Sequence, residues 1–537
     1  MIVIGLNASF YFGGGDASAC LIIDGKIVGA CEEERFTRIK HGRHQIPINS
    51  IKWLIKKGNI TIRDVDVIAL NTIGNDNFKN TLIEFFLQEF GCLPKKFKFY
   101  NHQLCHAASA YWGSGWKNSA ILSFDYSGDG LCGGFYEGIN GKIKTLDEIL
   151  TSSGNSLGKF YATFTQLLGF NRGDEYKLMG LSSYGNRNDL EKLDEIIYFK
   201  NDSFSINPEI YSSIKQTSMQ QKLFNIEVLK KIGLVHRIPE APVNKKHKKL
   251  AISVQVAFEK ATILLVKKLR RMSKQSKLSI AGGCAMNCVA ISKIRQSKLF
   301  KEIFVPPASG DAGTSVGAAY LATSENVKNI KQIQSAALGP AFTNTIIKQW
   351  IDRLNIKSKF IKNVEFDAAQ NLVKNKLIGW FQGGMEFGSR ALGHRSILAN
   401  PKNPHMKDLI NKKIKFRESF RPFAPSILEN SMPKYFKNSF PSPYMNEVFE
   451  VTNPQEIPAV THVDKTARVH TVKDNDHNRL FYSLLEEIET MNGTPIVLNT
   501  SLNINNQPIV CSPQEAIYTF FACGLDIIYL GSWKITK

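Results

Sequence analysis

Two short stretches decide the fold of this chain: Asp125-Tyr126-Ser127-Gly128-Asp129-Gly130 and Ser309-Gly310-Asp311-Ala312-Gly313-Thr314. Each one places a carboxylate and glycines after an apolar, strand-like segment. Glycine lets the backbone approach a ligand closely, and ligands of open α/β folds bind beyond the carboxyl ends of the strands. Two similar loops of this kind predict a duplicated nucleotide-binding fold with one loop in each half.

Strand and helix patterns alternate around these loops. Residues 2–6 and 19–23 are apolar runs, and Asp24-Gly25 predicts a hairpin to a returning strand over residues 26–31. Helical and strand-like periodicities then alternate over residues 48–101 and again over residues 250–322. This alternation predicts an α/β protein.

The length and composition indicate two large domains. The chain has 537 residues, 43% of them hydrophobic and 21% charged, which is enough to bury several cores. The composition changes near residue 345, where a block rich in proline and arginine begins. We therefore expect one domain over residues 1–344 and a second over residues 345–537.

The charge balance favours anionic partners. Lysine and arginine total 68 against 47 acidic residues, which gives a net charge of +21. Nucleotides, phosphates, tRNA and acidic glycans all fit this charge, as does an ordinary lysine-rich surface. The nine cysteines are irregularly spaced and predict no disulfide framework. The absence of a basic leader and of a long apolar run predicts a cytoplasmic protein with no membrane partner.

A pair of histidines is the first candidate metal site. His102 and His106 are four residues apart, so on a helix both imidazoles project from one face. That spacing suits two ligands of one metal ion, with Asp125 and Asp311 as the obvious carboxylates to complete the shell. The alternative is a pair of ordinary helix histidines.

A glycine turn and an arginine-rich region are further candidates. Residues 279–287 combine a strand, the pair Gly282-Gly283 and a helix start at Asn287, a pattern that suits an anion or a ribose but occurs in many tight turns. The glycines at 13–15 are a weaker signal. The blocks 387–396, 420–425, 461–468 and 498–503 supply guanidinium groups, hydroxyls and amides. Planar guanidinium groups suit a small, doubly anionic substrate, although surface arginines can also pair with acidic residues.

Taken together, these segments resemble the O-carbamoyltransferase family that tailors nodulation factors, cephalosporins, aminoglycosides and ansamycins. The resemblance runs nearly end to end. It includes residues 34–41, the His102/His106 helix, residues 177–181 with Tyr184-Gly185, the Gly282-Gly283 turn and the four C-terminal blocks. It implies an N-terminal domain of the actin-like ATPase superfamily, similar to the tRNA threonylcarbamoyl-transferring enzyme, and a YrdC-like C-terminal domain.

The resemblance also implies a function. In such enzymes the C-terminal domain makes carbamoyl adenylate from carbamoyl phosphate and ATP, and the N-terminal domain transfers the carbamoyl group to a hydroxyl. By this resemblance an iron-type divalent metal is held by His102, His106, Asp125 and Asp311. The nucleotide, with Mg²⁺, contacts Lys40, Asp129, Gly282, Gly283 and Asn287, and carbamoyl phosphate contacts Arg390, Arg421, His462, Arg468, Asn499 and Ser501.

One position departs from the family pattern. Related enzymes carry a His-Asp pair in the first loop, whereas this chain has Gly15-Asp16. The general base is then Asp16 or another group such as His41, or the chain has altered activity.

Two rival functions remain open at this point. One is a tRNA threonylcarbamoyl-adenosine-type enzyme, which the charge suits but which no RNA-binding motif supports, so that nucleic acid is not the expected partner. The other is an inactive nucleotide-binding paralogue. We expect the acceptor to be a hydroxyl of a sugar or secondary metabolite, recognised by residues 201–243, and a homodimer is the default expectation.

Overall fold

The computed structural model describes residues 1–8, 15–212, 221–475 and 477–537. The chain packs into two units. Unit 1 comprises Met1–Glu33 and His41–Gln334, and unit 2 comprises Glu34–Lys40 and Ser335–Lys537. The domain boundary at 344/345 stays a prediction, and each unit is described by itself.

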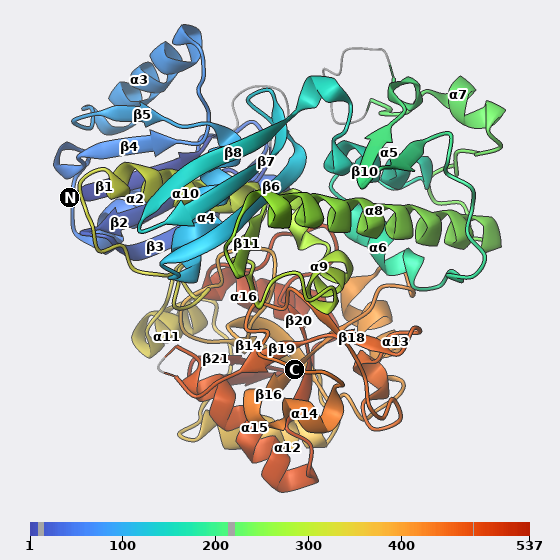
Figure 1. The fold of residues 1–537 in the computed structure, drawn as a ribbon. Helices are drawn as coiled ribbons and strands as arrows, with labels where there is room; N and C mark the ends of the chain where they lie inside the picture. Colours follow the sequence, from blue (N-terminus) through green and yellow to red (C-terminus); the bar gives the residue numbers. More distant parts are fainter. Residues whose placement is uncertain (9–14, 213–220, 476) are drawn as a thin grey trace. The chain divides into compact units, whose positions relative to one another are not determined.

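The first sheet of unit 1 contains five strands (Figure 1). They are β1 (Ile2–Asn7), β2 (Ser18–Ile23), β3 (Lys26–Glu32), β4 (Val67–Leu70) and β5 (Phe97–Phe99), in the order β3-β2-β1-β4-β5. The central strand β1 pairs antiparallel with the β2–β3 hairpin and parallel with β4, which is parallel to β5. The hairpin predicted at Asp24-Gly25 is therefore present.

The second sheet repeats this topology. Its strands are β6 (Asn118–Gly128), β7 (Leu131–Ile139), β8 (Lys142–Leu150), β11 (Lys277–Ala281) and β12 (Glu302–Phe304), in the order β12-β11-β6-β7-β8. Again the first strand of the set, β6, lies in the centre, with an antiparallel meander on one side and two parallel strands on the other. The duplicated α/β architecture predicted from the sequence is confirmed.

Helices cover these sheets and join them. They are α2 (Ile48–Gly58), α3 (Asp76–Phe90), α4 (His102–Ser114), α5 (Leu157–Leu167), α6 (Glu175–Ser182), α7 (Ile226–Lys231), α8 (Lys245–Met272), α9 (Cys288–Gln296) and α10 (Thr314–Ser324), with a small hairpin of β9 (Ile197–Lys200) and β10 (Ser203–Ile206). α4 packs closely on α10. A Cβ at Gly317 would lie 1.8 Å from the Cys105 carbonyl oxygen, so only glycine permits this approach.

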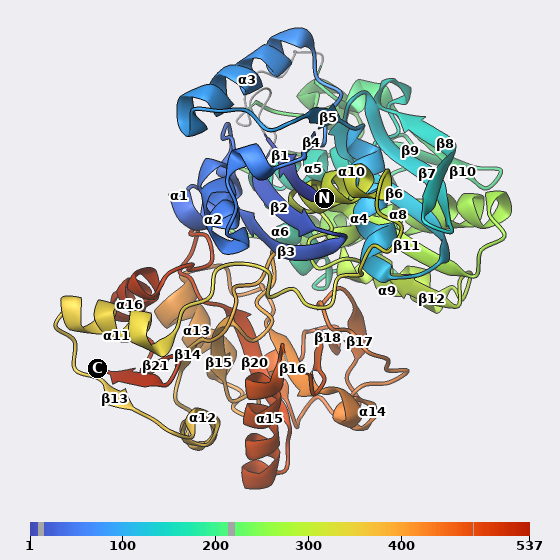
Figure 2. The same cartoon turned by 90° about the vertical axis from the view of Figure 1, so that its left-hand side faces the viewer.

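Unit 2 is built on an eight-stranded mixed sheet. Its order is β13 (Lys359–Phe360), β22 (Trp533–Thr536), β21 (Ile527–Leu530), β14 (Ile378–Phe381), β15 (Arg395–Ala399), β20 (Ile496–Ser501), β16 (Ala424–Leu428) and β19 (His470–Val472). α12 (Val364–Val373) and α15 (Arg479–Asn492), both visible in Figure 2, pack on one apolar face. α11 (Asn344–Arg353), α13 (Met406–Ile410), α14 (Met432–Tyr435) and α16 (Pro513–Ala522) belong to the other core, beside the short pair β17 (Val448–Glu450) and β18 (Thr466–Arg468).

Two arginines attach the segment Glu34–Lys40 to unit 2. This segment begins with α1 (Glu34–Thr37). Arg35 is fully buried and donates to the Gly388 carbonyl at 2.8 Å, and Arg38 donates to the carbonyls of Pro508 and Ile509, each at 2.7 Å. Because guanidinium groups saturate several carbonyls at once, this early motif of the chain contributes to the second unit.

Disulfide bonds and membrane-spanning helices are both absent from the described residues. All nine cysteines lie within the described ranges, and none of them forms a disulfide bond. Within the same ranges, no helix is both long and apolar enough to cross a bilayer.

The buried His470 on β19 predicts a pH-dependent stability. Burial, and secondarily the neighbouring His394, lowers the pKa of His470 to about 3. Its imidazole is thus neutral in the fold, and the stabilisation is complete above the unfolded pKa of about 6.5 and is lost as the pH falls toward 3. Each pH unit in this window costs about 1.4 kcal/mol. Between pH 6.5 and 5, wild type should lose about 2 kcal/mol more free energy of unfolding than His470→Asn in urea titrations. Equal losses in the two proteins would contradict this assignment.

Candidate active site

The N-terminus of α4 carries both predicted histidine ligands. The Asn101 side chain caps the helix by accepting from the backbone N–H of Gln103 and Leu104. Asp129 Oδ2 accepts from the backbone N–H of His102 at 2.9 Å, and the same carboxylate bonds to Thr72 and Ile73. Asp129, predicted to contact the nucleotide, therefore links the start of the helix that carries both histidines to Thr72 and Ile73.

The carboxylates come from the two loops that the duplication predicts. Asp125 lies near the end of β6, where its Oδ1 accepts the Gly283 N–H at 3.0 Å and its Oδ2 faces the imidazoles. Asp311 begins the short helical turn before α10. A Cβ at Gly128 would lie 2.3 Å from the His102 ring, so glycine makes room for that imidazole. The two loops and one helix turn thus converge on one point.

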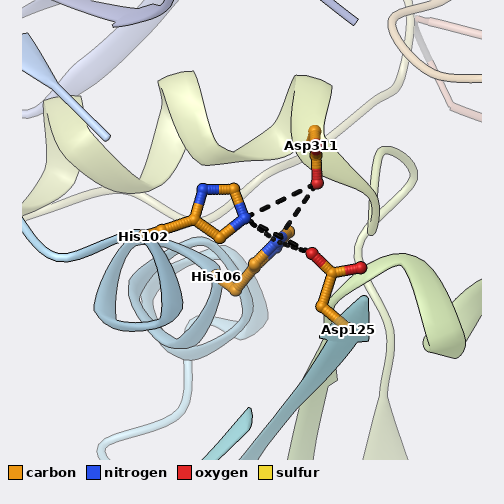
Figure 3. Close-up of side chains that lie close together, drawn as sticks. All are labelled: His102, His106, Asp125 and Asp311. Carbon is orange, nitrogen blue, oxygen red and sulfur yellow. Dashed lines mark hydrogen bonds and ion pairs between the residues drawn. The ribbon is translucent and has the colours of Figure 1, made fainter. Parts of the chain in front are cut away.

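Four donor atoms meet at this point, as Figure 3 shows. The His102 and His106 Nε2 atoms are 3.1 Å apart, and they lie 3.3 and 3.4 Å from Asp125 Oδ2. Asp311 Oδ1 is 3.6 Å from each. A tetrahedral ion with bonds of about 2.1 Å holds its ligand atoms about 3.4 Å apart. The spacing of this His2Asp2 cluster therefore fits a divalent metal ion such as zinc or iron.

The electrostatics of the cluster agree with a cation site. Burial by itself would lower the pKa of His102, but hydrogen bonds to Asp125 and Asp311 outweigh it and raise this pKa to about 10. Burial would raise the pKa of Asp125, yet its hydrogen bonds to the two histidines hold it well below its usual range. Asp125 and the partly exposed Asp311 therefore stay ionised, and without a metal ion the protonated His102 supplies positive charge beside them.

A chain of side-chain amides leads from this cluster to the first loop. Asn71 Nδ2 lies 3.4 Å from His102 Nδ1 and donates to Thr314 Oγ1 at 2.7 Å and to Asn7 Oδ1 at 2.9 Å. Asn7 Nδ2 in turn donates to the carbonyls of Gly15 and Asp16 at 3.1 and 2.9 Å. Sequence analysis missed both asparagines, although each follows an apolar strand, where polar residues of α/β sites gather.

His41 closes this chain at its far end. Its Nδ1 lies 2.8 Å from Asp16 Oδ1, and its backbone carbonyl accepts the Asp16 N–H. Both residues have left-handed backbones, with φ of 69° and 62°. Non-glycine residues rarely adopt this conformation, and such outliers cluster at functional sites. The structure thus brings together Asp16 and His41, both predicted as candidate bases.

Unit 2 contains a second polar cluster around a lysine that sequence analysis missed. Lys415 is only 3% exposed, and its ammonium group donates to the backbone oxygens of Ser501 and Asn503 and to both of their side chains. Burial, then the charges of Arg417 and Arg421, lower the pKa of Lys415 well below its usual range. The signal in the sequence was a lysine between the apolar residues Ile414 and Phe416.

The other residues predicted to hold carbamoyl phosphate occupy different settings in unit 2. Arg421 has an ion pair with Glu418 at 3.7 Å. The His462 ring faces the Phe420 carbonyl, and burial lowers its pKa. Asn499 donates to Ala391 O and to Ser426 Oγ. Arg390 and Arg468 are partly buried, and Arg468 ends β18. Ser501 is thus the predicted residue that directly contacts Lys415.

The predicted nucleotide contacts divide between the two units. Lys40 belongs to unit 2, whereas Gly282, Gly283 and Asn287 belong to unit 1. Gly282 allows the turn after β11 to approach β6, since a Cβ there would lie 2.1 Å from the Phe124 carbonyl oxygen. Asn287 caps α9 and bonds to Gln255 through both halves of its amide. Gly13, Gly14 and part of the predicted acceptor region, residues 213–220, lie outside the described residues.

Comparisons with known proteins identify the family. The model described as "Carbamoyltransferase N-terminus" matches residues 70–320, and "Carbamoyltransferase C-terminus" matches residues 369–537. The chain is 34% identical to nodulation protein NolNO of Sinorhizobium fredii, over 97% of this chain and 79% of that protein. It is also 34% identical to NolO of Bradyrhizobium diazoefficiens, over 81% of this chain and 79% of that protein.

A solved structure of full-length HypF in a phosphate- and nucleotide-bound form aligns with a TM-score of 0.35 at 14% identity, covering 62% of this chain and 56% of that one. The assignment to a family rests on the sequence comparisons. The chain belongs to the carbamoyltransferase family.

The His2Asp2 cluster predicts one tight divalent metal site per chain. Wild type should bind one equivalent of Co²⁺ with the intense visible absorption of a tetrahedral site, because all four donors already converge. His102→Ala or Asp125→Asn should weaken binding at least 100-fold in metal titrations. His44→Ala, which removes an exposed histidine, is the control and should bind like wild type. Undiminished binding by both site variants would exclude this cluster as the metal site.

Proposed function

We propose that this protein is an ATP-dependent O-carbamoyltransferase. Carbamoyl phosphate, water and ATP would give carbamoyl adenylate, phosphate and pyrophosphate in unit 2, and unit 1 would pass the carbamoyl group to a hydroxyl of a sugar or secondary metabolite, releasing AMP. The observation that carries the proposal is the buried His2Asp2 cluster in a chain of the carbamoyltransferase family. An internal transfer suits a mixed anhydride that water would otherwise destroy.

The cations of unit 2 support its role in forming the adenylate. Lys415 lies in a cradle of oxygens from Ser501 and Asn503, close enough to Arg417 and Arg421 for their charges to lower its pKa. The two guanidinium groups beside this cradle suit a small dianion such as carbamoyl phosphate, and the charge of that dianion would favour the protonated form of Lys415. Arg390, His462, Arg468 and Asn499 remain proposed contacts of the same substrates.

The residues of unit 1 support its role in carbamoyl transfer. A metal ion held by the His2Asp2 cluster would supply Lewis-acid stabilisation to a phosphate oxygen of the adenylate. Gly283 keeps Asp125 aimed at this position through its N–H. Iron, ATP and Mg²⁺ are the proposed cofactor and cosubstrate set, and Lys40, Asp129, Gly282, Gly283 and Asn287 are proposed to act with the nucleotide, Asp129 by holding the metal-binding helix.

His41 is the proposed general base, oriented by Asp16. The hydrogen bond from Nδ1–H to the Asp16 carboxylate would place the basic lone pair on Nε2, which would accept the proton of the acceptor hydroxyl as its oxygen attacks the carbamoyl carbon. A Cβ at Gly15 would lie 3.5 Å from His41 Cβ, an ordinary contact distance. His41 therefore lies beside the position where related enzymes carry their histidine.

The division of labour between the units is tested by partial reactions. Lys415→Met should abolish carbamoyl-phosphate-dependent ATP/pyrophosphate exchange, because the anion loses its buried cation, whereas His102→Ala should retain exchange and lose transfer to the acceptor. Lys412→Ala, an exposed neighbour, is the charge control. Thermal unfolding checks that each variant is folded. The absence of exchange in wild type, or its loss in folded His102→Ala, would overturn the scheme.

The proposed base predicts a rescue. His41→Ala should lower the rate of transfer to a hydroxyl acceptor, with glycerol at high concentration as the probe, by about 10²-fold or more. Adding Gly15→His to His41→Ala should restore part of this rate, since the new imidazole would extend from the adjacent position. ATP/pyrophosphate exchange should stay unchanged in both. If His41→Ala transfers at the wild-type rate, His41 is not the base.

A further inference from the structure

The outer nitrogen of His41 and the guanidinium of an arginine lie close to the same glycine, Gly173. A Cβ at Gly173 would lie 3.6 Å from His41 Nε2 and 3.3 Å from an outer guanidinium nitrogen, Nη2, of Arg43. Both groups therefore border the same point above Gly173. This glycine has a φ of 92°, so its backbone conformation, too, disfavours a side chain there. A guanidinium therefore lies close to the proposed base, beside a glycine that adds no side chain between them.

Arg43 has no partner of its own in the described part of the chain. The structure records neither a hydrogen bond nor an ion pair for its guanidinium among residues 1–8, 15–212, 221–475 and 477–537. Arg187 of the same unit differs, since it forms a bidentate pair with Glu259 at 2.8 and 2.9 Å. A half-buried guanidinium has five N–H donors, and one with no acceptor among the described residues suits a ligand that supplies acceptor oxygens.

The surroundings of Gly173 are positively charged. Arg172 lies over the Tyr126 ring at 5.0 Å, and Lys159 lies over the Tyr211 ring at 4.0 Å. Burial, then the charge of Arg172, lower the pKa of Lys159, which indicates that these two cations are neighbours.

The carboxylates nearby do not cancel this charge. Asp16 bonds to His41, and Asp174 bonds to Lys177 and Tyr176. Glu175 accepts the Gly173 N–H at 3.1 Å, and burial raises its pKa. Each of these three carboxylates thus already has a hydrogen-bond or ion-pair partner, whereas none is recorded for the Arg43 guanidinium among the described residues.

We propose that the acceptor of this enzyme is an anionic saccharide, whose carboxylate or phosphate is bound by Arg43 while a nearby hydroxyl faces His41. This inference rests on the proposed transfer function and names its substrate class. A neutral acceptor would bury the guanidinium without a partner, and a cationic one would be repelled. An anionic group is bound by the planar guanidinium in a fixed direction, which would orient the hydroxyl toward Nε2.

The test compares three probes on the full-length protein loaded with metal. Methyl β-D-glucuronide carries a carboxylate, glucose 6-phosphate carries a phosphate, and methyl β-D-glucoside carries neither. Ligand-observed NMR titrations give their affinities for wild type and for Arg43→Gln. At least one anionic probe should bind wild type about tenfold or more tightly than the glucoside, and Arg43→Gln should remove this preference while leaving the weak glucoside binding unchanged. The anionic probe that binds more tightly shows whether the acceptor carries a carboxylate or a phosphate.

Two controls separate this inference from the others. Arg63→Gln removes the same charge from an exposed position of unit 1 and should keep the preference of wild type. Carbamoyl-phosphate-dependent ATP/pyrophosphate exchange should be equal in wild type and Arg43→Gln. If wild type shows no exchange, the proposed function fails, independently of the preference for an anionic acceptor. The inference is overturned if neither anionic probe binds more tightly than the glucoside, or if the preference survives in Arg43→Gln.

Discussion

Two carboxylates held ionised in the protein interior are the constraint on which the rest of unit 1 depends. An ionised carboxylate out of water is costly unless a positive charge and hydrogen bonds compensate it. Here the compensation comes from His102 and His106, which sit one helical turn apart on α4 and face both Asp125 and Asp311. This arrangement requires α4, the end of β6 and the start of α10 to meet within a few ångströms. The absence of a side chain at Gly128 and Gly317 allows these elements to approach one another this closely.

The duplication of the fold explains how residues so distant in sequence share one site. Each five-stranded sheet carries loops at the carboxyl ends of its parallel strands, and those loops supply polar side chains. The first half contributes Asn7, Asn71 and the loop of Asp16, and the second contributes Asp125 and Asp311. The helix α4 lies between the two sets in sequence. The repeated topology therefore gives each sheet a similar edge, with side-chain amides prominent at the first and carboxylates at the second.

Much of this architecture can be predicted from local patterns. The hairpin at Asp24-Gly25 and the strand Lys277–Ala281 follow from turn chemistry and apolar runs, and the His102/His106 spacing with two loop aspartates predicts the His2Asp2 cluster. Some of these features depend on interactions between residues that are near in sequence. The others depend on combinations of residue types that have few alternative explanations.

Other features depend on tertiary contacts that no local pattern carries. The transfer of Glu34–Lys40 to unit 2 results from carbonyls near Gly388 and Ile509, more than 350 residues away. In the sequence, Lys415 cannot be distinguished from a surface lysine. The tertiary structure places Ser501 and Asn503 around its ammonium group. The sequence also does not show that Asp129 and Asn287 bond to the starts of helices, because helix starts and binding loops favour the same amino acids.

The shared amide of Asn71 has a mechanical consequence. A carboxamide carries two N–H groups, yet three acceptor atoms, on Asn7, His102 and Thr314, surround its nitrogen. Asn7 and Asn71 lie at the edge of the first sheet, while His102 and Thr314 begin the helices α4 and α10. Any opening of the first sheet away from these helices must break the contacts of Asn71 with His102 and Thr314 together. Asn71 therefore couples the first sheet to both helices, and Asn7 extends this coupling to the loop of Asp16.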